Sequence, residues 1–135
     1  IAMMSGADGV HVGQDDLSVP TVKELLSGQP VIGLSTHTAE QLAESLLLEV
    51  DYAAVGPIYE TTTKETGYSA VGLGAIASAR MFSAELPIVA IGGITVENAA
   101  DVLAAGASSV SVISDVFSGG DPTQRTRAYL ERLSV

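Results

Sequence analysis

The sequence predicts an α/β fold in which buried parallel strands alternate with helices. Short apolar runs rich in valine and isoleucine recur along the chain, and most of them lack polar alternation. Such runs are typical of parallel strands buried on both faces. Helical patterns with recognisable ends lie between them, and the strand–helix order repeats about five times in units of roughly 20 residues, as in a βα repeat.

The five predicted strands are the apolar runs themselves, at 9–12, 31–35, 52–56, 87–93 and 109–114. Three of the predicted helices begin at a recognisable serine or threonine cap. Ser18 can cap the helix that follows it, with Pro20 in its first turn and Gly28 at its end. Thr38 and Gln41 form a capping box. Thr95 can cap a helix that stops at Gly106.

Three other helical segments complete the pattern. Asp121, Pro122 and Gln124 open the last helix. The helix over 72–82 has the weakest start, because Gly72 and Gly74 lower its propensity. At the other end, residues 1–4 are expected to be the end of a helix that Gly6 stops.

The composition describes one globular domain and excludes several functions. Of the 135 residues, 47% are hydrophobic and 16% are charged, which predicts a single core-rich domain over 1–135. Cysteine is absent, which excludes disulfides and thiolate sites and is compatible with the cytoplasm, where we expect this protein. The net charge of −10 argues against nucleic acid as a partner. No apolar run approaches the ~20 residues of a membrane span.

Polar residues gather just after the predicted strands, and this favours a barrel over an open doubly wound sheet. Active sites of (β/α)8 barrels, the TIM-barrel family, lie on the loops that follow their strands. An open nucleotide-binding sheet should carry G-x-G-x-x-G after a strand, which this chain lacks. Such barrels have eight strands, so five βα units make an incomplete barrel with about three strands missing. We expect the chain to be the C-terminal portion of a longer protein.

Two glycine-containing loops suggest a phosphate site. Gly92 and Gly93 end one predicted strand and lead into a helix, where a bare backbone lets an oxyanion approach N–H groups. One strand later, Ile113 and Ser114 could present further N–H groups. A phosphate site built from the last two loops recurs in barrels. The alternative is that the two glycines only make a tight turn.

Three further residues are candidates for chemistry. Asp16 could hold Mg2+ through oxygen, or Asp15 and Asp16 could simply solvate a loop. Ser35 and His37 have no nearby acid in the sequence, so a nucleophilic triad is not supported. His37 could act as a base near neutral pH, although a hydrogen-bonded rim residue is the preferred interpretation, and His11 is expected to be structural.

The segment "TTTK", 61–64, lies in the longest connection, from Pro57 to Val71. Its hydroxyl and N–H groups can donate hydrogen bonds to a polar ligand, and Lys64 supplies a point charge for phosphate. Gly67 and the loop's length would allow it to close over a site. The alternative is a hairpin or a solvated loop.

Five motifs in the same order and spacing resemble one enzyme family over nearly the whole chain. They are "GVHVGQDD", "GLSTHT", "DYAAVGPIYETTTK", "PIVAIGGIT" and "GASSVSVIS". Together they resemble the thiamine-phosphate synthases, which are (β/α)8 barrels. The resemblance implies a transferase that joins 4-amino-5-hydroxymethyl-2-methylpyrimidine diphosphate to thiazole phosphate, releases pyrophosphate and uses Mg2+. These two small molecules are the implied partners, with no nucleic acid and no membrane.

The resemblance also implies roles for individual residues. Asp16 resembles a Mg2+ ligand, Ser35 a contact to the pyrimidine, and Lys64 a contact to the diphosphate. Thr61, Thr62 and Thr63 resemble the thiazole-phosphate loop. Gly93, Ile113 and Ser114 resemble the cradle of the thiazole phosphate. Lys64 and Ser35 are therefore the implied catalytic residues.

This chain lacks the Q-L-R-x-K-like motif and the N-D pair that the family carries upstream. Two alternatives stay open. One is a thiazole tautomerase-like isomerase, in which a histidine such as His37 serves as acid or base. The other is a non-catalytic phosphate-binding fragment, whose exposed sheet edge would favour homo-oligomers.

Overall fold

The computed structural model describes residues 1–26, 28–63, 67–82, 84–118 and 120–133. Its centre is a sheet of five parallel strands that follow one another in chain order across the sheet. The strands are β1 (Gly9–Val12), β2 (Val31–Thr36), β3 (Tyr52–Val55), β4 (Ile88–Ile91) and β5 (Ser109–Ser111). This arrangement confirms the predicted βα repeat.

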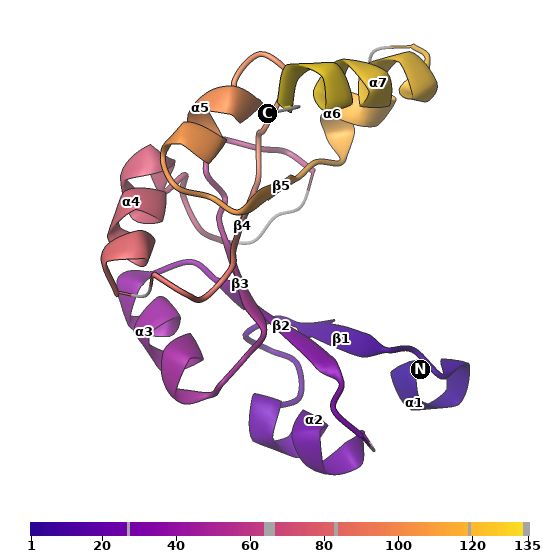
Figure 1. Ribbon diagram of the computed structural model, residues 1–135, viewed down its shortest axis with the longest axis vertical. Helices are drawn as coiled ribbons and strands as arrows, with labels where there is room; N and C mark the ends of the chain where they lie inside the picture. The colour runs from indigo at the N-terminus through magenta and orange to yellow at the C-terminus, as the bar shows by residue number, and fades with distance from the viewer. Residues whose placement is uncertain (27, 64–66, 83, 119, 134–135) are drawn as a thin grey trace.

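Helices follow the strands and lie along the outer side of the curved sheet (Figure 1). They are α2 (Val19–Leu25), α3 (Ala39–Leu47), α4 (Gly72–Phe82) and α5 (Ala99–Ala104). At the two ends of the chain, α1 (Ala2–Ser5) precedes β1, and α6 (Ser114–Phe117) and α7 (Pro122–Leu133) follow β5. The described residues form an arc whose inner, concave side carries no helices (Figure 1). Consecutive parallel strands with helices outside are the wall of an incomplete (β/α)8 barrel.

The core fills the space between the sheet and the helices. Alternate residues of β2 point outward into it: Ile32 is 1% exposed and Leu34 is 7% exposed. Ser35, the residue after Leu34, points to the concave side and is only partly buried. The prediction that the strands are buried on both faces holds for β3, where the consecutive residues Ala53, Ala54 and Val55 are all buried, whereas β4 buries only alternate residues.

Two predicted helix starts are confirmed by their caps. The Ser18 hydroxyl accepts a hydrogen bond from the Thr21 N–H at 3.4 Å. The Thr38 hydroxyl accepts one from the Gln41 N–H at 3.3 Å. The reciprocal half of the capping box is different from the prediction, because the Gln41 side chain accepts from the N–H of His37 at 2.7 Å instead of that of Thr38.

Other element boundaries differ from the prediction. α2 ends at Leu25, before Gly28. α5 begins after Asn98 instead of Thr95, because the Asn98 side chain accepts from the Thr95 N–H and holds the intervening residues in a turn. The predicted strand over 109–114 stops at Ser111, and Ser114 begins the unpredicted short helix α6.

Arg80 joins several chain segments at the end of the sheet where β4 and β5 begin. Its Nε donates to the Gly106 carbonyl at 2.6 Å, and its Nη1 donates to the carbonyls of Ala84 and Leu86 at 3.1 and 3.2 Å. Its Nη2 donates to the Ser108 hydroxyl at 2.6 Å. Arg80 thus satisfies polar groups at the opposite end of the sheet from the loops that follow the strands.

Among the described residues, no helix combines the length and the apolar character that a bilayer crossing requires.

Candidate active site

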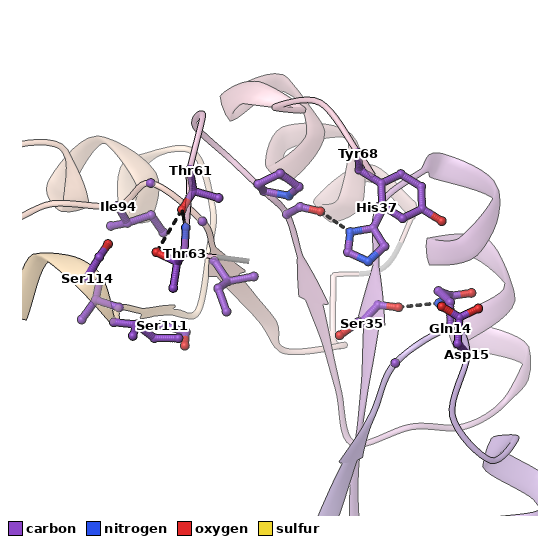
Figure 2. Close-up of a pocket in the computed structure, with 18 of the residues that line it drawn as sticks. Gln14, Asp15, Ser35, His37, Thr61, Thr63, Tyr68, Ile94, Ser111 and Ser114 are labelled. Atoms are coloured by element: carbon purple, nitrogen blue, oxygen red, sulfur yellow. Dashed lines mark hydrogen bonds between the residues drawn. The ribbon is translucent and has the colours of Figure 1, made fainter. Parts of the chain in front are cut away.

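A pocket of about 380 Å3 lies where the strands end, and we call it the central pocket (Figure 2). Its lining comes from residues that end or follow all five strands: 13–16 after β1, 35 and 37 in and after β2, 56, 57, 61, 63 and 68 after β3, 91–94 at β4, and 111–114 at β5. Because the sheet is parallel, these loops meet at one edge. This is the edge that carries active sites in (β/α)8 barrels.

The structure brings most of the predicted site residues into this pocket. Those that line it are Asp16, Ser35, Thr61, Thr63, Gly93, Ile113 and Ser114. Thr62 lines an adjoining cavity of about 390 Å3, the side pocket, which shares Thr61, Gly93 and Ser114 with the central one. Lys64 lies outside the described residues.

Ser35 is held by a histidine that the sequence did not connect to it. The His11 Nε2 atom lies 2.9 Å from the Ser35 hydroxyl, and His11 Nδ1 lies 3.0 Å from the Tyr52 hydroxyl. Burial lowers the pKa of His11, and the charge of Asp16 opposes this shift only in part. A neutral imidazole bonded on both sides fixes the direction of the Ser35 hydroxyl. The third group is a phenol and not a carboxylate, in agreement with the absence of a predicted triad.

Space for this arrangement comes from Gly33 on β2. A Cβ atom there would lie 2.1 Å from the Tyr52 ring and 2.5 Å from His11 Nδ1. His11 and Gly33 are paired in the register of β1 and β2, and Gly33 is paired with Tyr52 across β2 and β3. The glycine thus leaves room for the rings of His11 and Tyr52 to meet over β2, where they stack with centroids 5.4 Å apart.

His37 is a hydrogen-bonded rim residue, as the preferred interpretation of the sequence had it. Its Nδ1 donates a hydrogen bond to the Gly56 carbonyl, which can only accept. The ring stacks on Tyr68, with centroids 4.1 Å apart and planes inclined by 16°. Gln41 donates to the Tyr68 hydroxyl at 3.3 Å. The pair forms one aromatic wall of the central pocket (Figure 2).

Asp16 can contribute one oxygen ligand to a metal ion. Its Oδ2 accepts a hydrogen bond from the Gly13 N–H at 2.7 Å, which fixes the carboxylate at the pocket. The described residues contain no group of three or more acidic, histidine or cysteine side chains that could hold a metal by themselves. One carboxylate fits Mg2+ only where substrate phosphates and water supply the other ligands, which is a common arrangement for this ion.

The connection from Pro57 to Val71, which we call the threonine loop, contains a turn held by its own hydroxyl groups. Thr61 Oγ1 accepts from the Thr63 N–H and donates to the Thr63 hydroxyl, both at 3.2 Å (Figure 2). At the base of the loop, Val71 N–H donates to the Pro57 carbonyl at 2.8 Å and Gly72 N–H to the Ile58 carbonyl at 3.0 Å. Two of the threonines therefore hold a local turn, and the described part of the loop is anchored at both ends.

The two glycines after β4 are required by chain packing. A Cβ atom on Gly93 would lie 2.6 Å from the Glu60 carbonyl oxygen and 2.7 Å from the Tyr59 Cβ. Gly93 also has a positive φ of 64°. A Cβ atom on Gly92 would lie 2.5 Å from that of Pro57. The tight-turn alternative thus accounts for the glycines themselves, and a phosphate role for Gly93 stays a prediction.

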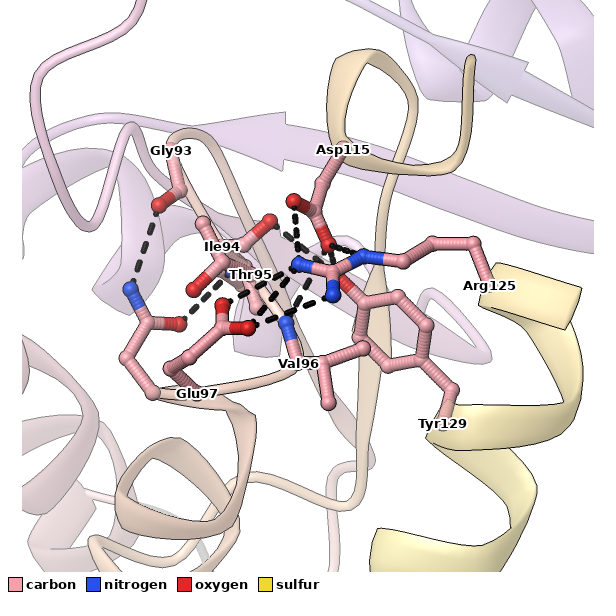
Figure 3. Close-up of polar contacts among 9 residues, drawn as sticks. Gly93, Ile94, Thr95, Val96, Glu97, Asp115, Arg125 and Tyr129 are labelled. Atoms are coloured by element: carbon pink, nitrogen blue, oxygen red, sulfur yellow. Dashed lines mark hydrogen bonds and ion pairs between the residues drawn. The ribbon is translucent and has the colours of Figure 1, made fainter. Parts of the chain in front are cut away.

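A cluster of charged and phenolic groups, the Asp115 cluster, lies beside the side pocket (Figure 3). It consists of Glu97, Asp115, Arg125 and Tyr129. Arg125 binds Asp115 through Nε at 2.9 Å and Nη2 at 2.8 Å, and binds Glu97 at 3.1–3.2 Å. The Tyr129 hydroxyl lies 2.6 Å from Asp115 Oδ2.

These contacts set the protonation states of the cluster. Hydrogen bonding from Arg125 lowers the pKa of the Asp115 carboxyl, with smaller contributions from Tyr129 and the Val96 N–H. Hydrogen bonding to Asp115 raises the pKa of Arg125. Burial, followed by the bond to Asp115, raises the pKa of Tyr129. Asp115 is therefore a charged carboxylate and Tyr129 a neutral phenol at neutral pH.

Sequence reasoning missed two kinds of site residue. Tyr68 could have been noticed as an aromatic residue in an otherwise polar loop. The Asp115 cluster gave no signal, because Glu97, Asp115 and Arg125 are separated in sequence and no local rule pairs them.

The sequence profile of the family described as thiamine monophosphate synthase matches residues 1–116. The chain belongs to the thiamine monophosphate synthase family. The resemblance stated from the five motifs is thereby confirmed.

Individual members of the family agree with this placement. The chain is 40% identical to a thiamine-phosphate synthase of Bacillus cereus (strain AH187) over 134 residues, and 44% identical to one of Laribacter hongkongensis (strain HLHK9) over 127 residues. A thiamine phosphate pyrophosphorylase from Pyrococcus furiosus superposes with a TM-score of 0.86 at 30% identity and covers 97% of this chain.

The chain spans only part of each relative. It covers 61% of the Bacillus cereus protein, 59% of the Laribacter hongkongensis protein and 61% of the Pyrococcus furiosus chain.

Proposed function

We propose that the protein containing this chain is a thiamine-phosphate synthase. It joins 4-amino-5-hydroxymethyl-2-methylpyrimidine diphosphate to thiazole phosphate and releases pyrophosphate. The observation that carries the proposal is the central pocket, where Ser35, Thr63, Gly93 and Ser114 converge from four different strands in a chain of this family.

The proposed reaction needs charge stabilisation more than a protein nucleophile. The bond between the pyrimidine methylene carbon and the diphosphate oxygen breaks, and its electron pair leaves with the pyrophosphate. The lone pair of the thiazole nitrogen then forms the new carbon–nitrogen bond. The Ser35–His11 pair is consistent with this chemistry. No carboxylate supports the histidine, so the pair can orient the serine hydroxyl but does not form the triad that would activate it as a nucleophile.

Each part of the pocket has a task in this proposal. The Ser35 hydroxyl, oriented by His11, hydrogen-bonds the pyrimidine. The threonine loop and the N–H groups of Gly93, Ile113 and Ser114 hold the thiazole phosphate. These assignments are supported by their common location and by the motifs of the family.

The diphosphate end lies at the β1 side of the pocket in this proposal. Asp16 would hold Mg2+ there together with substrate oxygens, and Lys64 would contact the diphosphate. When bound, Mg2+ would neutralise charge that develops on the leaving diphosphate. In this chain, the proposal assigns diphosphate binding to Asp16, which acts through Mg2+, and to Lys64.

The test is synthesis by the full-length protein. Both substrates and Mg2+ are supplied, and thiamine phosphate and pyrophosphate are quantified together. Equal amounts of the two products support the proposal. If only the thiazole substrate is isomerised, and His37→Asn abolishes that change, the function is instead that of a tautomerase.

A further inference from the structure

We propose that Arg125 is a positioning residue for the phosphate group of the thiazole substrate. It acts through Asp115, by holding the β4–α5 loop against α6 and by cancelling a carboxylate charge beside the side pocket. This inference rests on the proposed function and extends it to a residue that touches no substrate, since Arg125 lines neither pocket.

The first argument is the tether between two loops. Asp115 directly follows Ser114, and both line the side pocket. Its Oδ2 accepts a hydrogen bond from the Val96 N–H at 3.2 Å, and Val96 lies three residues after Gly93. One carboxylate thus connects the loop that carries Gly93 to the helix that carries Ser114 (Figure 3). The distance between the two proposed phosphate-binding segments depends on where that carboxylate is held.

Arg125 and Tyr129 fix the position of the carboxylate from α7. Arg125 makes a two-pronged contact with both oxygens of Asp115, a geometry that defines the orientation of a carboxylate. The Tyr129 hydroxyl donates its proton to Asp115 Oδ2 at 2.6 Å, and it lies within 3.4 Å of the Ile94 carbonyl in the same β4–α5 loop. Tyr129 is only 6% exposed, so this support is firmly packed.

The second argument is charge. A carboxylate on the wall of a pocket for an anion would repel that anion, and the chain as a whole already carries a net charge of −10. The Asp115 side chain is 14% exposed, so solvent screens it poorly, and Arg125 is the cation that neutralises it. The Glu97 side chain is 70% exposed and its ion pair with Arg125 therefore contributes little. The ion pair between Arg125 and Asp115 is therefore the contact that neutralises charge at the wall of the side pocket.

The experiment compares four forms of the full-length protein: wild type, Arg125→Met, the double variant Arg125→Met/Asp115→Asn, and Arg127→Met. Arg127 lies on the same helix and is exposed, so Arg127→Met is a control that makes the same change in charge and side-chain type. The asparagine in the double variant keeps an oxygen that can accept from the Val96 N–H but carries no charge.

Two readouts are taken. Steady-state kinetics give kcat and the separate KM values for thiazole phosphate and pyrimidine diphosphate. Titration with inorganic phosphate, followed through the amide resonances of Gly93 and Ser114, gives anion affinity without turnover. Thermal melts accompany both, so that loss of folding is recognised.

Arg125→Met should raise KM for thiazole phosphate by about 10- to 100-fold, since misplacement of a binding group by ~1 Å can cost roughly that much. In Arg125→Met, KM for pyrimidine diphosphate should stay near the wild-type value. In Arg127→Met, the affinity for inorganic phosphate should stay near the wild-type value. The double variant should recover the part of the phosphate affinity that the unpaired Asp115 charge costs, whereas the part that depends on the position of residue 115 should stay lost.

Equal losses for both substrates, or no recovery in the double variant, would overturn the inference. So would a wild-type protein whose Gly93 and Ser114 resonances do not respond to phosphate. A wild type that binds phosphate at these amides but forms no thiamine phosphate would refute the proposed function, while the phosphate titrations would still decide the role of Arg125.

Discussion

Replacing Gly93 with alanine should destabilise the protein strongly. The added Cβ would lie 2.6 Å from the Glu60 carbonyl oxygen and 2.7 Å from the Tyr59 Cβ, both well inside contact distance. Overpacking of this kind costs about 1–3 kcal/mol. The positive φ of 64° adds about 1–2 kcal/mol for any residue with a Cβ. We therefore expect the free energy of unfolding to fall by about 2–5 kcal/mol.

Gly72→Ala is the matched control for this experiment. Gly72 has a φ of 70°, close to that of Gly93, but a Cβ atom there would meet nothing within 4 Å. It should show the conformational cost of about 1–2 kcal/mol without the packing cost. Urea unfolding of wild type and both variants of the full-length protein, analysed with a common slope, measures the difference. If Gly93→Ala and Gly72→Ala are equally stable, the backbone contact with Tyr59 and Glu60 does not limit residue 93.

Three other changes test the remaining assignments. Lys64→Met should lower kcat of the full-length enzyme by about 10²–10³, as loss of one preorganised electrostatic contact does; a kcat within twofold of wild type would remove Lys64 from the site. Asp16→Ala should raise the Mg2+ concentration needed for half-maximal rate, and an unchanged Mg2+ titration contradicts its role as a ligand. Burial lowers the pKa of His11 below the ordinary 6.5, so the unfolded chain binds more protons and stability falls as pH drops below 6.5; melts of wild type and His11→Gln between pH 5 and 7 should show that the variant loses this part of the pH dependence.

The parts of the fold that local rules govern could be predicted from the sequence. The strands follow from their valine- and isoleucine-rich runs, and Ser18 and Thr38 cap helices through hydrogen bonds to residues three positions away. The start of α6 could not be predicted in this way. The run ending at Ser114 has the composition of a strand, but Asp115 bonds to Val96 and Arg125, which are distant in sequence.

In the candidate site, too, local motifs could be read from the sequence, whereas contacts between residues distant in sequence could not. Its residues were found by motif, because each motif lies on one loop. The contact between His11 and Ser35 depends on the register of β1 against β2, and no pattern within either strand specifies that register. The packing reason for Gly93 likewise involves the segment after β3, which only the folded chain brings beside it.

The Arg80 contacts have a practical consequence for engineering. They lie where β4 and β5 begin, whereas the pocket lies where the strands end, so the Arg80 contacts and the pocket loops occupy opposite ends of the same sheet. Substitutions that strengthen the Arg80 end can therefore be combined with redesign of the pocket loops, and their effects on stability should add because the two groups of residues share no partner.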